Sequence, residues 1–104
     1  METSYCESPS AKVYVQVKVF FDPAGFMKPV ELIWKDGKVF RIEQVIDMHE
    51  SQAAYSSVRR DKYTVKICGQ QCSLYFERTR LPHGMQVGRW YVERKILTPL
   101  KKTA

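Results

Sequence analysis

The sequence predicts a small all-β domain, and three observations support this prediction. Residues 12–21 and 62–67 alternate apolar and polar side chains with the period of two that a half-buried strand shows. Turn-forming pairs at residues 36–37 and 69–70 separate strand-like segments, as in β-hairpins. Helical spacing of apolar residues is almost absent. We therefore expect a small curled antiparallel sheet or partly open barrel of about six strands, with at most one short helix.

The length and composition indicate one ordinary globular domain. The chain has 104 residues, of which 44% are hydrophobic and 27% charged, and this is enough for a single core. We expect a single β domain over residues 12–97, with flexible tails at residues 1–11 and 98–104. No apolar run reaches the roughly 18 residues of a membrane span, and the first residues do not resemble a signal peptide. A cytoplasmic protein without membrane association is expected.

Two segments in the first half predict three strands. Residues 12–21 form a long strand that the turn formers at residues 22–25 end. Residues 29–35 and 38–47 form a hairpin around Asp36-Gly37, a pair typical of type I′ turns, with Trp34 opposite Val39. The alternation slips near Glu43, which predicts a bulge or a strand end there. Trp34 is either a core residue or, with Leu32, half of an exposed apolar patch.

Residues 62–77 predict the second hairpin and define its two faces. A type II′ turn at Gly69-Gln70 would set Val65 opposite Leu74 and Tyr63 opposite Phe76. Val65, Leu74 and Phe76 should then be buried together. Cys72 should lie in the core and Cys68 outside it, so we expect ordinary reduced thiols at Cys6, Cys68 and Cys72, with no disulfide between the last two and no metal.

The remaining segments are less regular. Residues 48–61 are compatible with a short helix or with an irregular connection that ends at a polar tip, residues 59–61. Residues 78–88 predict a loop. Residues 89–96 predict the last strand, with Trp90 and Val92 facing opposite to Tyr91 and Glu93.

Three segments carry a resemblance to a known family. These are Pro29-Val30 with Trp34-Lys-Asp-Gly-Lys-Val-Phe-Arg-Ile-Glu-Gln-Val-Ile-Asp47, then Tyr63-Thr-Val-Lys-Ile with Leu74-Tyr-Phe, and Gly88-Arg-Trp-Tyr-Val-Glu93. Together they resemble an uncharacterised family of small bacterial all-β domains of unknown function. The resemblance implies the fold and a bacterial origin, and it carries over no functional residue.

Catalytic chemistry is not indicated. His49 and His83 lie in different connections without a cysteine or carboxylate at motif spacing, apart from Asp47 two residues before His49. No phosphate loop, nucleophile elbow or zinc motif is present in the sequence. We expect a protein that is not an enzyme and that needs no cofactor.

The distribution of charge is the main functional clue. The formal net charge is +6, yet residues 1–77 hold ten Lys/Arg and ten Asp/Glu. Residues 78–104 hold seven cations against Glu93 alone. Arginine binds phosphate through a planar fork, and tyrosine can stack on bases. The candidate nucleic-acid-binding residues are Arg78, Arg80, Arg89, Arg94, Lys95, Tyr75 and Tyr91.

Other interpretations of this basic end stay open. It can be a solvated rim that aids solubility, or it can contact an acidic protein partner. The leading hypothesis is a small non-catalytic binding domain that contacts nucleic acid, either single-stranded or without regard to sequence, through the basic C-terminal end. The alternative is a protein-interaction module that uses an exposed sheet edge or the Trp34 hairpin. An internal small-molecule pocket is a third possibility.

Overall fold

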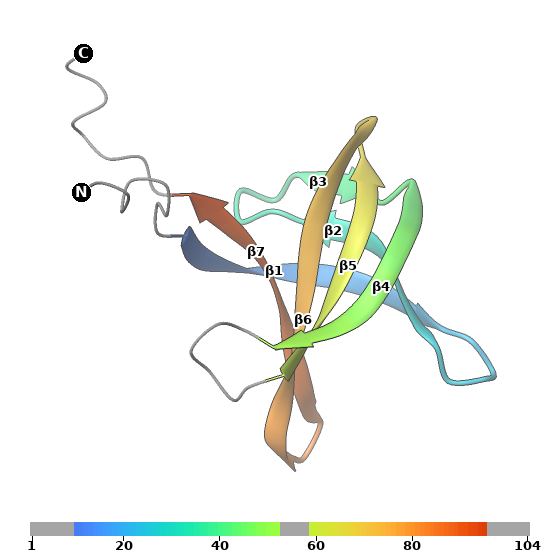
Figure 1. Cartoon of the computed structure of the whole chain (residues 1–104), viewed down its shortest axis with the longest axis vertical. Helices are drawn as coiled ribbons and strands as arrows, with labels where there is room; N and C mark the ends of the chain where they lie inside the picture. Colours follow the sequence, from blue (N-terminus) through green and yellow to red (C-terminus); the bar gives the residue numbers. More distant parts are fainter. Residues whose placement is uncertain (1–9, 53–58, 96–104) are drawn as a thin grey trace.

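The computed structural model describes residues 10–52 and 59–95, which form one seven-stranded antiparallel sheet (Figure 1). The strands are β1 (Ser10–Phe21), β2 (Met27–Ile33), β3 (Val39–Arg41), β4 (Gln44–Gln52), β5 (Arg59–Ile67), β6 (Gln70–His83) and β7 (Gln86–Lys95). Their order in the sheet is β3-β2-β1-β7-β6-β5-β4. The described ranges contain no helix, and thus none long and apolar enough to cross a membrane. The predicted all-β class is confirmed, with seven strands rather than six.

The sheet curls into a half-barrel along β1, because the two halves of this long strand pair with different neighbours. Its first half pairs with β7, and its second half pairs with β2, with a register shift between Lys18 and Val19. The two ends of the sheet are drawn together by a short link between β3 and β4. The Ile42 amide donates to the Val30 carbonyl on β2, and the next amide, of Glu43, donates to the Lys66 carbonyl on β5.

The core lies inside this curl. Its buried members come from five parts of the chain: Leu32, Ile42, Tyr63, Val65, Leu74, Phe76 and Trp90. Val15, Val17 and Val19 of β1 pack against them, as the alternation in this strand predicts. Val65 and Leu74 are 0% and 1% exposed, and Phe76 is also buried. The predicted joint burial of these three residues is therefore confirmed.

The β5–β6 hairpin keeps the predicted faces but not the predicted turn. The turn residues are Cys68 and Gly69, both with positive φ (53° and 76°), as a type I′ turn requires. Val65 consequently lies opposite Cys72 and not Leu74. This slip of two residues preserves the faces, because side chains alternate with a period of two. Cys72 is exposed, so its predicted core position is wrong; Leu74 is the buried β6 residue nearest the turn.

In the β2–β3 hairpin, the observed strand register differs from the predicted register by one residue. The Gly37 amide donates to the Trp34 carbonyl, and the Trp34 amide donates to the Lys38 carbonyl, so the loop has three residues and ends in Gly37 with φ of 91°. Ile33, not Trp34, is therefore opposite Val39. Such loops combine a type I turn with a glycine bulge, in place of the predicted type I′ turn. The predicted strand end near Glu43 is confirmed, since β3 ends at Arg41 and β4 begins at Gln44.

Two predicted connections are mostly strand. Residues 48–52 belong to β4 and residues 59–61 to β5, so neither the helix nor the irregular connection describes them; residues 53–58 lie outside the described part. Asp61, predicted in a polar tip, is 5% exposed. The predicted loop at residues 78–88 is largely an extension of β6 and β7, with a register irregularity between Arg78 and His83. Of the predicted tails, residues 1–9 and 98–104 lie outside the described residues as well.

Candidate nucleic-acid interface

The predicted basic end is spread along β6 and β7. The last strand, β7, pairs with β6, with Tyr91 opposite Tyr75 and Gly88 opposite Arg78. Six residues separate Gly88 from Arg94 on β7, a distance of about 20 Å along a strand. Arg78 and Arg94 therefore lie toward different ends of the half-barrel and do not form one rim.

Arg89 lies on a different face from Arg94. Trp90 and Val92 pack toward the core, so Arg94 projects on the core side and Arg89 on the outer side of β7. The Arg89 guanidinium lies 3.8 Å from the ring centroid of Tyr14 on β1. The side chains of Arg80 and Lys95 lie outside the described part of the structure. The described members of the predicted site thus occupy three separate places.

Tyr75 and Tyr91 are covered rather than open to a base. They are 7% and 1% exposed, and their rings stack with centroids 5.1 Å apart. The Arg60 guanidinium lies 4.2 Å from the Tyr75 centroid, and the Lys12 ammonium lies 4.8 Å from the Tyr91 centroid. Because both tyrosines are buried, their rings offer no exposed surface on which a base could stack in the predicted way.

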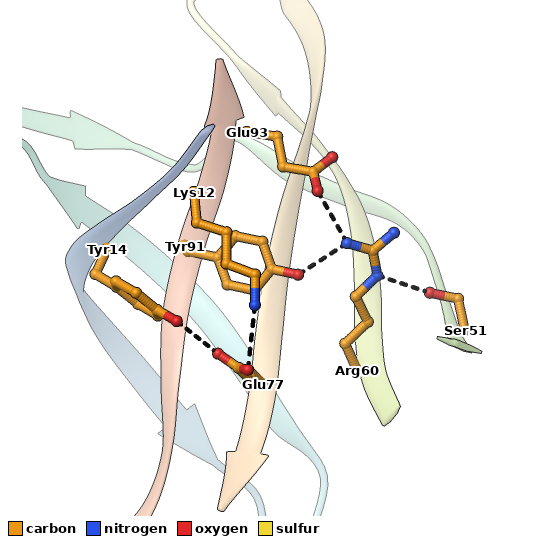
Figure 2. A network of polar contacts seen from close by, with 7 residues as sticks. All are labelled: Lys12, Tyr14, Ser51, Arg60, Glu77, Tyr91 and Glu93. Atoms are coloured by element: carbon orange, nitrogen blue, oxygen red, sulfur yellow. Dashed lines mark hydrogen bonds and ion pairs between the residues drawn. The ribbon is translucent and has the colours of Figure 1, made fainter. Parts of the chain in front are cut away.

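A polar network of seven residues, Tyr91 among them, lies on the outer face (Figure 2). Its first half centres on Arg60 of β5. The Arg60 guanidinium donates to the Tyr91 hydroxyl at 2.8 Å, to Glu93 at 3.0 Å and to the Ser51 hydroxyl at 3.3 Å. Burial alone would lower the pKa of Arg60, but the bonds to Tyr91 and Glu93 outweigh it and raise that pKa. The guanidinium therefore stays charged and joins β4, β5 and β7.

The second half of the network centres on Glu77 of β6. The Tyr14 hydroxyl donates to this carboxylate at 2.8 Å, and the Lys12 ammonium donates to it at 3.2 Å (Figure 2). Burial alone would raise the pKa of Glu77, but these two bonds and the charges of Lys12 and Arg89 lower it. The charges of the network pair with one another, so it acts as a clamp between strands and not as an open binding surface.

A better candidate surface lies at the other side of the sheet, around Trp34. A hollow of about 460 Å³ is bounded by the β2–β3 hairpin and by the ends of β5 and β7. We call it the Trp34 hollow, and its lining residues are Leu32, Trp34, Asp36, Lys38, Phe40, Ile67 and Arg94. Its volume falls in the range of about 300–1,000 Å³ that small-molecule sites have.

Cations surround the half-buried Trp34 ring. The Arg94 guanidinium lies 5.6 Å from the ring centroid, and the Lys35 ammonium lies 5.8 Å from it. Lys38 lines the same hollow. The nearby Asp36 carboxylate accepts a hydrogen bond from the Lys38 amide at 2.9 Å, so it is held by the turn. An aromatic surface thus stands beside three cations and one carboxylate.

This site was only partly predictable. Arg94 is among the predicted nucleic-acid-binding residues, whereas Trp34, Lys35 and Lys38 are not; the Trp34 hairpin is predicted only as a possible surface for a protein partner. The available signal was the local sequence Trp-Lys-Asp-Gly-Lys, in which a turn holds an aromatic residue between two lysines. What the sequence does not reveal is that Arg94, sixty residues away, joins them.

Among the side chains that the structure describes, His49, Cys68 and Cys72 offer no comparable site. His49 lies on β4, where its Nδ1 is 3.2 Å from Asp47 Oδ2, and both side chains are more than half exposed. Within residues 10–52 and 59–95, no group of three His, Cys, Asp or Glu side chains is arranged to hold a metal ion.

Comparison with protein-family models, curated proteins and solved structures finds no match to this chain. The resemblance to a bacterial family therefore stays a prediction.

Proposed function

We propose that this domain is a non-catalytic binding module that contacts single-stranded nucleic acid at the Trp34 hollow. The observation that supports the proposal most is the position of Arg94 and Lys35 over one half-buried tryptophan beside a hollow of about 460 Å³. Sequence-indifferent binding of single strands combines two such elements, an aromatic surface on which a base stacks and cations that follow the phosphates.

The lining of the hollow suits an unstacked base. Leu32 is buried, and Phe40 and Ile67 are partly buried against the core, so they supply an apolar floor next to Trp34. A base in this floor would place its phosphates near the exposed Lys35, Lys38 and Arg94. Duplex bases are stacked inside the helix and cannot enter a hollow in this way. The proposal therefore concerns single strands. It also includes the cytoplasmic location that the sequence predicts.

The charge of the whole domain favours the same partner. The described residues hold 15 of the 17 Lys/Arg and nine of the 11 Asp/Glu, so they carry the entire excess of six positive charges. A net positive domain attracts phosphate chains over distances of about a Debye length, roughly 10 Å at 0.1 M salt.

The alternative, β-augmentation by a partner strand, receives less support. β4 is the last strand in the sheet order and the longer of the two end strands. It exposes the polar side chains of Asp47, His49 and Glu50, and its register shifts between Val45 and Asp47. Charged side chains and bulges on an end strand are devices that discourage pairing with another chain.

The proposal is tested with a fluorescently labelled single-stranded oligonucleotide and anisotropy at several salt concentrations. The test variant carries Lys35→Gln, Lys38→Gln and Arg94→Gln. Wild type should bind weakly, with affinity falling as salt rises from about 50 to about 200 mM, and the variant should bind more weakly still. Loss of three phosphate contacts should reduce the slope of log K against log salt by about two, since each contact to a single strand contributes about 0.7.

A matched control removes the same charge elsewhere. Lys18→Gln, Lys28→Gln and Arg89→Gln replace three exposed cations that do not line the Trp34 hollow. This control should retain most of the affinity and a slope close to that of wild type. Equal losses in both variants would contradict the Trp34 hollow as the site, and absence of binding by wild type at about 50 mM salt would contradict nucleic-acid binding itself.

A further inference from the structure

A second hollow, of about 380 Å³, opens at a different part of the half-barrel. Its lining residues come from the turn between β1 and β2, from strands β4 and β5, and from the hairpin of β6 and β7. We call it the apolar cup. The residues that matter for the argument are Phe21, Phe26, Met48, Val87, Asp61 and Arg78. None of them lines the Trp34 hollow.

The walls of the cup are apolar side chains that are largely exposed to solvent. Phe21, Phe26 and Val87 are 61%, 68% and 62% exposed, and Met48 is 46% exposed. Single exposed apolar residues are common on protein surfaces, but several around one hollow mark a binding site. An apolar body placed between these side chains would remove their surface from water, which is favourable in proportion to the area buried.

The cup reaches the core. Tyr63 and Phe76 line its base, and they are only 4% and 7% exposed. The Tyr63 hydroxyl donates to the Met27 carbonyl at 3.3 Å, so this polar group is already satisfied. A flat partner surface would cover the rim and leave the base unfilled. A small, narrow molecule can fill both.

One ion pair gives the cup its polarity. Asp61 accepts three contacts from Arg78: Nε at 3.3 Å from Oδ2, and the second terminal nitrogen at 3.2 Å from Oδ1 and 3.1 Å from Oδ2. The Asp61 side chain is 7% exposed, but that of Arg78 is 59% exposed. Within the described residues the first terminal nitrogen of Arg78 has no hydrogen-bond partner. The guanidinium therefore keeps a donor edge for a second anion, whereas the carboxylate is already occupied.

From this arrangement we propose that the apolar cup binds a small amphiphilic carboxylate. Its apolar body lies between Phe21, Phe26 and Val87, and its head accepts hydrogen bonds from the free edge of Arg78. The cup has about the volume of a dozen water molecules in the liquid, which limits the ligand to a short chain or a single ring system. A cationic head would have to displace Arg78 from Asp61, and a neutral head would leave the charge of Arg78 unused.

The test compares octanoate, octanol and octylammonium, which share one chain and differ in the head group. Binding is measured by titration calorimetry, and the site by changes in backbone amide resonances. Octanoate should bind about tenfold more tightly than octanol, because a hydrogen bond to a charged group is the stronger kind. Octylammonium should bind most weakly. The shifted resonances should be those of the cup, Gly25, Met48 and Val87 among them.

Two variants locate the head and the chain. Arg78→Gln should weaken octanoate about tenfold and leave octanol unchanged. Phe26→Ala, at an exposed wall position where folding is not at risk, should weaken both ligands about fivefold. Arg89→Gln removes the same charge on the outer face and should change neither affinity. If Arg78→Gln does not fold, the preference of wild type for octanoate and the Phe26→Ala result still decide the proposal.

Three results would overturn it. Equal affinity for octanol and octanoate would exclude recognition of the head. Octanoate shifts that fall outside the cup would exclude the site. Self-association of wild type with the cup resonances broadened would assign this surface to a second copy of the chain.

Discussion

The ring of Phe76 on β6 lies so close to Gly88 on β7 that a β-carbon at Gly88 would come within 2.6 Å of the ring Cζ. The same β-carbon would lie 2.6 Å from the Glu77 carbonyl oxygen, which belongs to the backbone and cannot move away alone. Glycine is required here by the close approach of the two strands, since its own φ is not positive.

Gly88→Ala should therefore lower the free energy of unfolding by about 1–3 kcal/mol, as overpacking does in other cores. Urea denaturation followed by tryptophan fluorescence measures this change. Phe76→Leu removes the obstructing ring atoms, so its effect and that of Gly88→Ala should add up to more than the loss in the double variant. A Gly88→Ala protein as stable as wild type would show that β6 and β7 are farther apart than the structure has them.

Glu77 should make stability depend on pH. Its pKa is lowered in the folded protein, because hydrogen bonds from Tyr14 and Lys12 outweigh the effect of burial. A depressed carboxyl pKa contributes stability that is present above the unfolded value, ordinarily 4.5, and is lost as the pH falls through the folded value. Glu77→Gln should thus cost about 1 kcal/mol at neutral pH, a small figure because Lys12 is partly exposed.

The measurement is urea denaturation of wild type and Glu77→Gln between neutral pH and pH values well below 4.5. The difference in unfolding free energy should shrink as the pH falls. Tyr14→Phe, which keeps the charge of Glu77 and removes one donor, should show part of the effect. A difference that stays constant with pH would mean that the network does not act through the ionised carboxylate.

Cys72 should react as a weak nucleophile although it is exposed. Partial burial, together with the nearby Cys68 thiol, raises the pKa of Cys72 above its ordinary value of 9.0. Its alkylation by iodoacetamide should require a higher pH in the folded protein than in urea, with peptide mass spectrometry as the readout. The same titration in urea should find three free thiols in total, the number of cysteines in the chain. Identical pH profiles for Cys72 in the two states would contradict the raised pKa.

The faces of the strands were predictable because alternation records burial directly. Leu74 is nine positions after Val65, and their shared face follows from the period of two with either two-residue turn, at residues 68–69 or 69–70. The turn itself was not predictable. A left-handed backbone at Cys68 is uncommon for any residue other than glycine, and cysteine is not among the residues enriched there. The preference of type II′ turns for glycine at the first position therefore led to the wrong turn pair, Gly69-Gln70 instead of Cys68-Gly69.

The path from β3 to β4 explains why the sequence does not predict the Trp34 hollow as one site. The sequence suggests one continuous strand from residue 38 to residue 47 with a bulge or an end near Glu43. In the structure, the Ile42 amide bonds to β2 and the Glu43 amide bonds to β5, and these two hydrogen bonds hold the two ends of the sheet together. Ile67 and Arg94 reach the Trp34 hairpin only through this curl. No local pattern records such a contact, because it depends on how seven strands close.

The most direct test of the central claim is the fluorescence of Trp34 during titration with a single-stranded oligonucleotide. The chain has two tryptophans, and the other, Trp90, is 8% exposed in the core. The account predicts quenching of wild-type emission on binding, reversal as salt rises from about 50 to about 200 mM, and loss of the quenching in Trp34→Phe. Unchanged wild-type emission on binding, or equal quenching in Trp34→Phe, would contradict it.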